Sequence, residues 1–175
     1  MPSIRFQAMN DLIYNQKDIP ADQWRYGLRS SASTGCGWIA TYNALRLMGY
    51  QVEIPRLISY YAHQLPLIHG TFGTSFWGPA QFFRHWGFPV KMVFDRDRFD
   101  SAAQAAPVCI LFFRWKKGLK LGAHFVALRH NGSQFIGFNT YSGSHSPDPY
   151  GESLSEFIRK RHYFGCVLLT IEPRT

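Results

Sequence analysis

The chain has 175 residues, 46% of them hydrophobic and 17% aromatic, with 19 basic and 11 acidic residues and a formal charge of +8. A chain of this length fits one domain and buries roughly 70% of its unfolded surface. No apolar stretch approaches the roughly 18 residues of a membrane span, and the first residues lack the basic start and apolar core of a signal peptide. We therefore expect a single globular domain over residues 1–175, with no membrane partner.

The cysteines and the charge distribution narrow the setting further. Three cysteines, Cys36, Cys109 and Cys166, cannot all pair with one another, and no C-x-x-C motif occurs. A reducing, cytoplasmic setting is the default expectation, with secretion by an unconventional route as the alternative. Basic residues are scattered, and the densest run, 114–120, is interpreted as one loop, so a nucleic-acid partner is not expected.

The first half of the chain is predicted to be mainly helical. The residue pattern predicts helices over 36–48, over 55–64 and from Pro79 to Gly87. Pro55 and Pro79 suit a first helical turn, where no backbone N–H is needed. The helix over 36–48 is apolar on most sides, so it must be buried on most sides.

The second half is predicted to consist mainly of strands. Strands are expected at 89–94, 107–114, 123–130, 134–140 and 165–172, with helical segments at 95–106 and 152–163. Helices followed by an antiparallel sheet define an α+β domain. The buried helix that begins at Cys36 is expected to lie against this sheet.

Cys36 has surroundings that differ from those of the other two cysteines. It stands between Gly35 and Gly37 in a turn that opens the first helix. A thiol at a helix N-terminus meets unpaired N–H groups and the positive end of the peptide dipoles, which favour the thiolate. Cys109 and Cys166 lie in continuous apolar runs and are interpreted as core residues. Cys36 is therefore a candidate nucleophile, with a structural thiol as the alternative.

The dipeptide Asn131-Gly132 between two strand-like runs predicts a two-residue hairpin turn. In that register residue 130 faces residue 133, and His124 faces Asn139 on the same side of the sheet. Directly opposed side chains have Cβ atoms roughly 4.5–5.5 Å apart, within reach of an imidazole–amide contact. Thr140 would point to the other face, although a bulge or a longer loop would reopen the choice.

These residues supply the groups that acyl transfer by a thiol requires. Cys36 would attack a carbonyl carbon as the thiolate, and His124 would protonate the leaving group. Asn139 would fix the tautomer and rotation of the imidazole. Each histidine or asparagine taken alone is also compatible with a purely structural role.

The chain resembles the papain-like cysteine peptidases, most closely the peptidase C39-like group of bacterial proteins. The resemblance rests on Tyr14-Asn15-Gln16-Lys17-Asp18, Trp24, Tyr26-Gly27, Ser33-Thr34-Gly35-Cys36-Gly37, Gly122-Ala123-His124-Phe125-Val126-Ala127-Leu128 and Gly137-Phe138-Asn139. It departs from the family at Trp38, where proline is usual, and at Asn139-Thr140-Tyr141, where Asn-Asp-Pro is frequent.

The resemblance implies a papain-like fold and a hydrolase that cleaves a peptide or amide bond in a peptide or protein substrate through a thioester acyl-enzyme. It also implies an oxyanion hole formed by the Cys36 backbone N–H and a glutamine amide. Gln16 matches the family's glutamine, Gln23 is a weaker candidate, and Ser30 has the spacing used by plant-type papain relatives. No cofactor is implied.

Two alternatives to a peptidase stay open. One is a different thiol acyltransferase or a cell-wall amidase on the same scaffold, and another is a catalytically inactive peptide-binding homologue. In that last case aromatic side chains could line a ligand groove, namely Phe72, Phe76, Trp77, Phe82 and Trp86. Metal catalysis is not expected, because His63 and His69 are six residues apart and no Cys/His cluster has zinc-ligand spacing.

Overall fold

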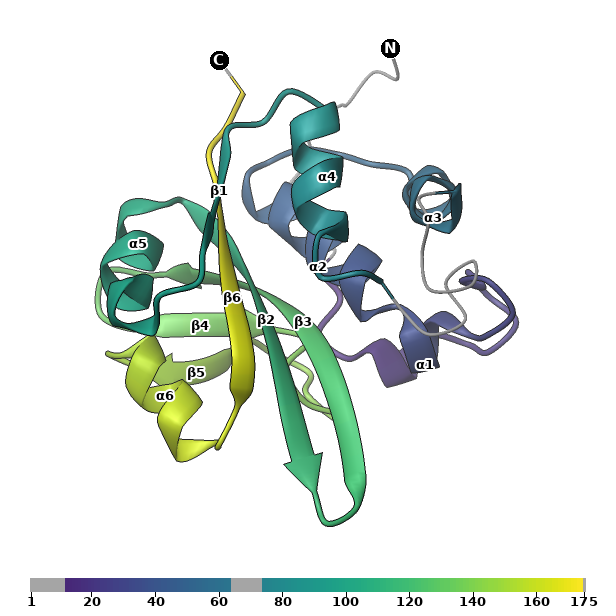
Figure 1. The fold of residues 1–175 in the computed structure, drawn as a ribbon. Coiled ribbons are helices and arrows are strands. Elements are labelled where there is room, and N and C mark those ends of the chain that lie inside the picture. Colours follow the sequence, from purple (N-terminus) through teal and green to yellow (C-terminus); the bar gives the residue numbers. More distant parts are fainter. Residues whose placement is uncertain (1–11, 64–73, 175) are drawn as a thin grey trace.

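The computed structural model describes residues 12–63 and 74–174 (Figure 1). The helical elements, in chain order, are η1 (Gln16–Asp18), α1 (Ser31–Thr34), α2 (Cys36–Leu47), α3 (Ile54–His63), α4 (Gly78–His85), η2 (Arg96–Arg98), α5 (Phe99–Ala105) and α6 (Leu154–Lys160). The strands are β1 (Val90–Val93), β2 (Val108–Lys117), β3 (Lys120–His130), β4 (Phe135–Phe138), β5 (Asp148–Gly151) and β6 (Phe164–Ile171).

The six strands form one sheet in the order β1-β6-β2-β3-β4-β5. Every neighbouring pair in it is antiparallel. Helices α1 to α4 lie on one side of the sheet and α5 and α6 on the other (Figure 1). The α+β class is confirmed. Within the residues that the structure describes, no helix is long and apolar enough to cross a membrane.

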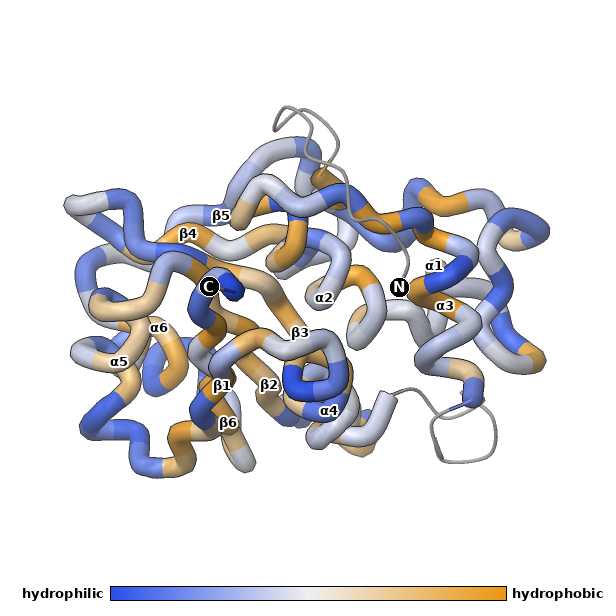
Figure 2. Tube along the Cα trace, turned by 90° about the horizontal axis from the view of Figure 1, so that it is seen from above, coloured by the Kyte–Doolittle hydropathy of each residue, from blue (hydrophilic) through white to orange (hydrophobic). Residues whose placement is uncertain are grey.

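Alternating side chains of β2 separate the hydrophobic core into two clusters. Ile110 and Phe112 belong to the cluster that α2 to α4 complete, and Leu111 and Phe113 belong to the cluster beneath α5 and α6. A strand that is covered on both faces needs a continuous apolar run rather than a strict alternation, as β2 has. Figure 2 shows this hydrophobic band along β2 and β3.

Helix α2 is the central helix of the first cluster. Its residues from Gly37 to Arg46 are all buried, and it packs against β2 and β3. The predicted placement of the Cys36 helix against the sheet is therefore confirmed. Gly49 follows the helix with φ +83°, a conformation that glycine adopts without steric cost.

The predicted loop over 114–120 is wrong. Strands β2 and β3 continue to Lys117 and from Lys120, so most of this run belongs to a long hairpin that projects from the sheet (Figure 1). The side chain of Leu119 at its tip is fully exposed. The strands could not be recognised from the sequence pattern here, because exposed basic residues interrupt the apolar run without interrupting the backbone pairing.

The predicted two-residue turn after β3 is also wrong. His130 pairs with Phe135, and the Asn131 backbone N–H donates to the Gln134 carbonyl across a four-residue loop. The Asn131 side-chain oxygen accepts hydrogen bonds from the backbone N–H groups of Ser133 and Gln134 and so holds the wider loop. The register shifts by two residues, and β4 ends at Phe138, before Asn139.

Three short elements were not predicted, namely η1, α1 and β5. The first two lie in the segment that leads to Cys36, and β5 forms the edge strand beside β4. Elements of three or four residues carry too few side chains for a periodic pattern to stand out.

Candidate active site

Cys36 is the first residue of α2, and its side chain is half-buried. The backbone N–H groups of Phe125, Gly37 and Cys36 itself face the sulfur and act to lower the pKa of its thiol. Burial raises the pKa of the Cys36 thiol, and these three N–H groups only partly oppose the rise. This direction is opposite to the one expected from the helix terminus alone, because desolvation disfavours the charged thiolate.

The open edge of β3 explains why a backbone N–H from the sheet can reach Cys36. Phe125 pairs with Phe112 of β2 on one side, whereas β4 pairs with β3 only from Ala127 to His130. The N–H of Phe125 therefore lies beyond the end of β4. The start of α2 approaches this stretch of β3, since the Phe125 N–H acts on the Cys36 sulfur.

His124 precedes Phe125 on the same open edge and is half-buried. Its ring lies edge-on to the Phe113 ring, with 5.8 Å between the centroids. Its Nε2 lies 2.7 Å from the backbone carbonyl oxygen of Asn139. Since a carbonyl can only accept, Nε2 carries a proton and donates, which leaves Nδ1 as the acceptor of a neutral imidazole.

The surroundings of His124 favour the neutral form of its imidazole. Burial lowers the pKa of His124, and the bond to the Asn139 carbonyl only partly opposes this. A neutral imidazole and a neutral thiol form no ion pair. Among the described residues, no hydrogen bond joins the Cys36 sulfur to the His124 ring; apo sites are often looser than the reacting complex.

Asn139 contacts His124, but by a different group from the one predicted. The backbone carbonyl holds the imidazole, while the side-chain amide is turned toward Gln16. Asn139 has φ +69°, which asparagine tolerates better than most residues, and this conformation directs the chain out of β4. In the structure the His124 ring is therefore contacted by the main chain of Asn139 and not, as predicted, by its side chain.

Gln16 lies in η1 and is bound to Asn139 at two points. Its backbone N–H donates to the Asn139 side-chain oxygen at 2.8 Å, and its own side-chain oxygen accepts from the Asn139 amide at 3.3 Å. The Gln16 amide also donates to the Ala32 carbonyl at 3.1 Å, four residues before Cys36. Gln23 is exposed. The contacts therefore favour Gln16 over Gln23 as the candidate oxyanion donor.

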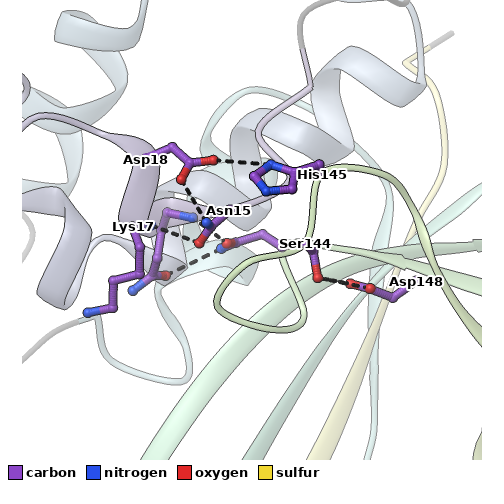
Figure 3. Close-up of polar contacts among 8 residues, drawn as sticks. Asn15, Lys17, Asp18, Ser144, His145 and Asp148 are labelled. Carbon is purple, nitrogen blue, oxygen red and sulfur yellow. Dashed lines mark hydrogen bonds and ion pairs between the residues drawn. The ribbon is translucent and has the colours of Figure 1, made fainter.

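The segment that carries Gln16 is held by a polar network (Figure 3). Asn15 accepts from the Lys17 backbone N–H and donates to the Asp18 carboxylate at 2.8 Å. Asp18 lies 3.8 Å from His145 in the loop after β4. These contacts fasten η1 to the segment that follows Asn139, so Gln16 and the end of β4 are positioned together.

Two residues beside Cys36 were given no role by the sequence. Tyr26 is fully buried, and its hydroxyl lies 3.2 Å from that of Thr74. Burial raises the pKa of Tyr26, and the nearby Cys36 adds to the effect. A Cβ added at Gly37 would collide with the Thr74 side chain. The Tyr26-Gly27 element could have indicated Tyr26, whereas nothing in the sequence indicated Thr74.

The other two cysteines are core residues, as predicted. Cys109 is fully buried near the start of β2, and Cys166 is buried with an Arg96 guanidinium 3.8 Å from its sulfur. Of the predicted aromatic groove, Trp77 is 42% exposed, whereas Phe82 is buried and Phe72 lies outside the described residues. In the described ranges, no group of three or more His, Cys, Asp or Glu residues could hold a metal ion.

Comparison with known proteins finds no family model that matches this chain and no similar curated protein. The chemistry must therefore be argued from the residues themselves. The site contains a half-buried thiol on Cys36 and a neutral imidazole with one fixed tautomer on His124. The candidate oxyanion donors are the Cys36 backbone N–H and the Gln16 side-chain amide. Together these groups can carry out proton transfer and covalent attack on a carbonyl.

Proposed function

We propose that this protein is a papain-like cysteine peptidase of the C39-like group, which hydrolyses a peptide or amide bond through a thioester on Cys36. The observation that carries the proposal is the meeting of the α2 start with the open edge of β3. There the Cys36 sulfur lies beside the N–H of Phe125, directly after His124. The Asn139 carbonyl binds the imidazole, and the Asn139 side chain is hydrogen-bonded to the Gln16 backbone N–H.

Acylation begins from the neutral pair. As a substrate carbonyl enters, Nδ1 of His124 takes the Cys36 thiol proton and the sulfur bonds to the carbonyl carbon. The backbone N–H of Cys36 and the amide of Gln16 stabilise the oxyanion. The carbon–nitrogen bond then breaks, and His124 returns the proton to the departing amine.

Deacylation follows the same path with water as the nucleophile. His124 removes a proton from water, the hydroxide adds to the thioester carbon, and the carbon–sulfur bond breaks. The proton passes from His124 to the Cys36 sulfur, so the acid product leaves and the enzyme returns to its starting state. The bond between Nε2 and the Asn139 carbonyl holds the ring orientation throughout, and it stabilises the imidazolium when that forms.

Covalent trapping tests the proposal. The protein is incubated with a peptide aldehyde or epoxide, and the modified residue is located by mass mapping. We expect modification at Cys36 and not at Cys109 or Cys166, and we expect His124→Gln to remove this selectivity. The matched control is Cys109→Ser, which removes a buried thiol near the start of β2 and should leave the labelling of Cys36 unchanged.

Two outcomes would overturn the proposal. Equal labelling of all three thiols in the folded protein would mean that Cys36 is not activated. Selective labelling that survives His124→Gln would mean that the imidazole is not the base. Amine incorporation in place of hydrolysis would identify an acyltransferase, and peptide binding without any acyl-enzyme would identify an inactive peptide-binding homologue.

A further inference from the structure

A cavity of about 600 Å³ lies between α3, α4 and the segment around Tyr26. Its described walls are Tyr26, Tyr60, Tyr61, His63, Thr74, Ser75, Trp77, Gly78, Gln81, Arg84 and His85. This volume falls in the range of small-ligand sites and exceeds what one side chain occupies.

The inner end of this cavity adjoins the candidate nucleophile. Tyr26 and Thr74 line the cavity and are joined by their hydroxyl groups. Thr74 also fills the space left by the missing side chain of Gly37, directly after Cys36. A peptide bound at Cys36 could therefore extend a side chain into the cavity past Tyr26 and Thr74.

The described walls of the cavity include one arginine and two histidines and no Asp or Glu. Arg84, His63 and His85 line it, and Arg84 forms no ion pair with any described residue. The sequence contains no Asp or Glu from residue 54 to residue 94, the stretch that supplies nearly the whole wall. An arginine without a carboxylate partner is available for a carboxylate from a ligand.

The histidine and aromatic side chains add to this preference. The Nδ1 atom of His63 donates to the Ser59 carbonyl at 2.7 Å, so its Nε2 is the atom left for a ligand. The ring of His85 packs beside that of Tyr60, with 5.6 Å between the centroids. Aromatic walls suit an aliphatic stem, and the Arg84 guanidinium suits its charged end.

We propose that this cavity binds an acidic side chain of the substrate peptide, with the Arg84 guanidinium binding its carboxylate. The inference rests on the proposed function, because it treats the cavity as part of the peptide-binding surface next to Cys36. It adds a substrate class: peptides that carry a glutamate near the bond that is cleaved.

The test uses binding, so that it does not depend on turnover. The probes are short, otherwise neutral fluorescent peptides in which a single Glu, or Gln as its neutral isostere, is moved along the chain. They are titrated by anisotropy against the Cys36→Ala protein. At one position we expect Glu to bind about 10- to 100-fold more tightly than Gln, as a charge-assisted hydrogen bond would give.

The matched variants are Arg84→Gln and Arg56→Gln, which each remove one positive charge. Arg56 is exposed on α3, pairs with Glu53 at 2.7 Å and does not line the cavity. We expect Arg84→Gln to abolish the Glu preference and Arg56→Gln to preserve it within about twofold.

A Glu preference at no position, or equal losses in the two arginine variants, would overturn the inference. Equal losses would indicate general attraction to a chain of formal charge +8. The two proposals fail separately. Selective acylation of Cys36 without a Glu preference would contradict only the proposal that the cavity binds an acidic side chain. A Glu preference without acylation would contradict only the proposal of a peptidase.

Discussion

The two halves of strand β3 have the same partner on one edge and different surroundings on the other. From Ala127 to His130 the strand is paired by β2 and β4 on both edges. At His124 and Phe125 only β2 pairs with it, and the other edge faces the start of α2 and the chain that leaves β4.

This difference shows how the fold makes room for chemistry. In the doubly paired half, backbone groups are used by the sheet and side chains fill the core. In the half that β4 has left, a backbone N–H lies beside the Cys36 sulfur and a backbone carbonyl binds the His124 ring. Substitutions in the two halves should therefore separate stability from reactivity.

The largest expected effect lies in the doubly paired half. Leu128 is fully buried between Cys109 and Gly137, so Leu128→Ala leaves a cavity in the core. We expect it to lower the free energy of unfolding by about 2–5 kcal/mol, measured by urea denaturation. The rate at which Cys36 is labelled should stay close to that of the wild type under conditions in which the variant is folded.

Leu121→Ala is the matched control on the same strand. Leu121 is 70% exposed near the hairpin tip, and its loss should change the free energy of unfolding by no more than about 0.5 kcal/mol. If the folded Leu128→Ala protein lost selective labelling of Cys36, the separation between the two halves of β3 would be wrong.

The next effect is expected at the open half. Gln16→Ala removes the candidate oxyanion amide, and removing one such donor typically slows acylation by about 10²–10³-fold. The measurement is the burst of nitrophenolate from an activated N-acyl amino acid ester. Gln23→Ala serves as the control, because that glutamine is exposed. A slower burst in the Gln23 variant than in the Gln16 variant would reverse the assignment.

The sequence predicted the parts of the molecule that depend on side-chain patterns. The apolar run after Cys36 gave a helix that had to be buried, and the run around Cys109 gave a central strand covered on both faces. The order of helices and strands then gave the α+β class. These patterns are local, and burial of apolar surface decides them.

The contacts of the site could not be predicted in the same way. His124 is held by a main-chain carbonyl, and Cys36 faces the main-chain N–H of Phe125. Neither contact can be predicted from residue type, because every residue except proline has both of these main-chain groups. The prediction of a two-residue turn was wrong because the Asn131 side chain stabilises a four-residue loop. The pKa of Cys36 moved opposite to expectation, since its burial depends on elements distant in the sequence.

Asn139 allows its side-chain and main-chain roles to be tested separately. Asn139→Ala loses both hydrogen bonds to Gln16 and places a Cβ residue without a polar side chain at φ +69°. We expect a loss of about 1–3 kcal/mol in the free energy of unfolding. Asn139→Gly loses the same hydrogen bonds without the backbone strain and should cost less. Both keep the carbonyl that holds His124, so a burst in the folded Gly variant that is slower than in Gln16→Ala would show that the Asn139 side chain does more than hold Gln16.

The smallest effect, and the one that reports directly on the neutral pair, is the pH dependence. Burial lowers the pKa of His124 below its ordinary 6.5, so the imidazole should remain a competent base at that pH. Below its lowered pKa, the acylation burst should fall about tenfold per pH unit, measured between about pH 8 and pH 4. A thiolate–imidazolium pair would instead keep iodoacetamide labelling of Cys36 fast throughout this range.

The same shift affects stability with a fixed sign. Below pH 6.5 the unfolded chain protonates His124 while the folded protein does not, so the unfolded state binds more protons. The free energy of unfolding contributed by this residue therefore falls as pH falls from 6.5 toward the lowered pKa, and then levels off. His124→Gln should remove this part of the pH dependence. A slope that persists unchanged in that variant would show that other groups bind these protons, and it would contradict a lowered pKa for His124.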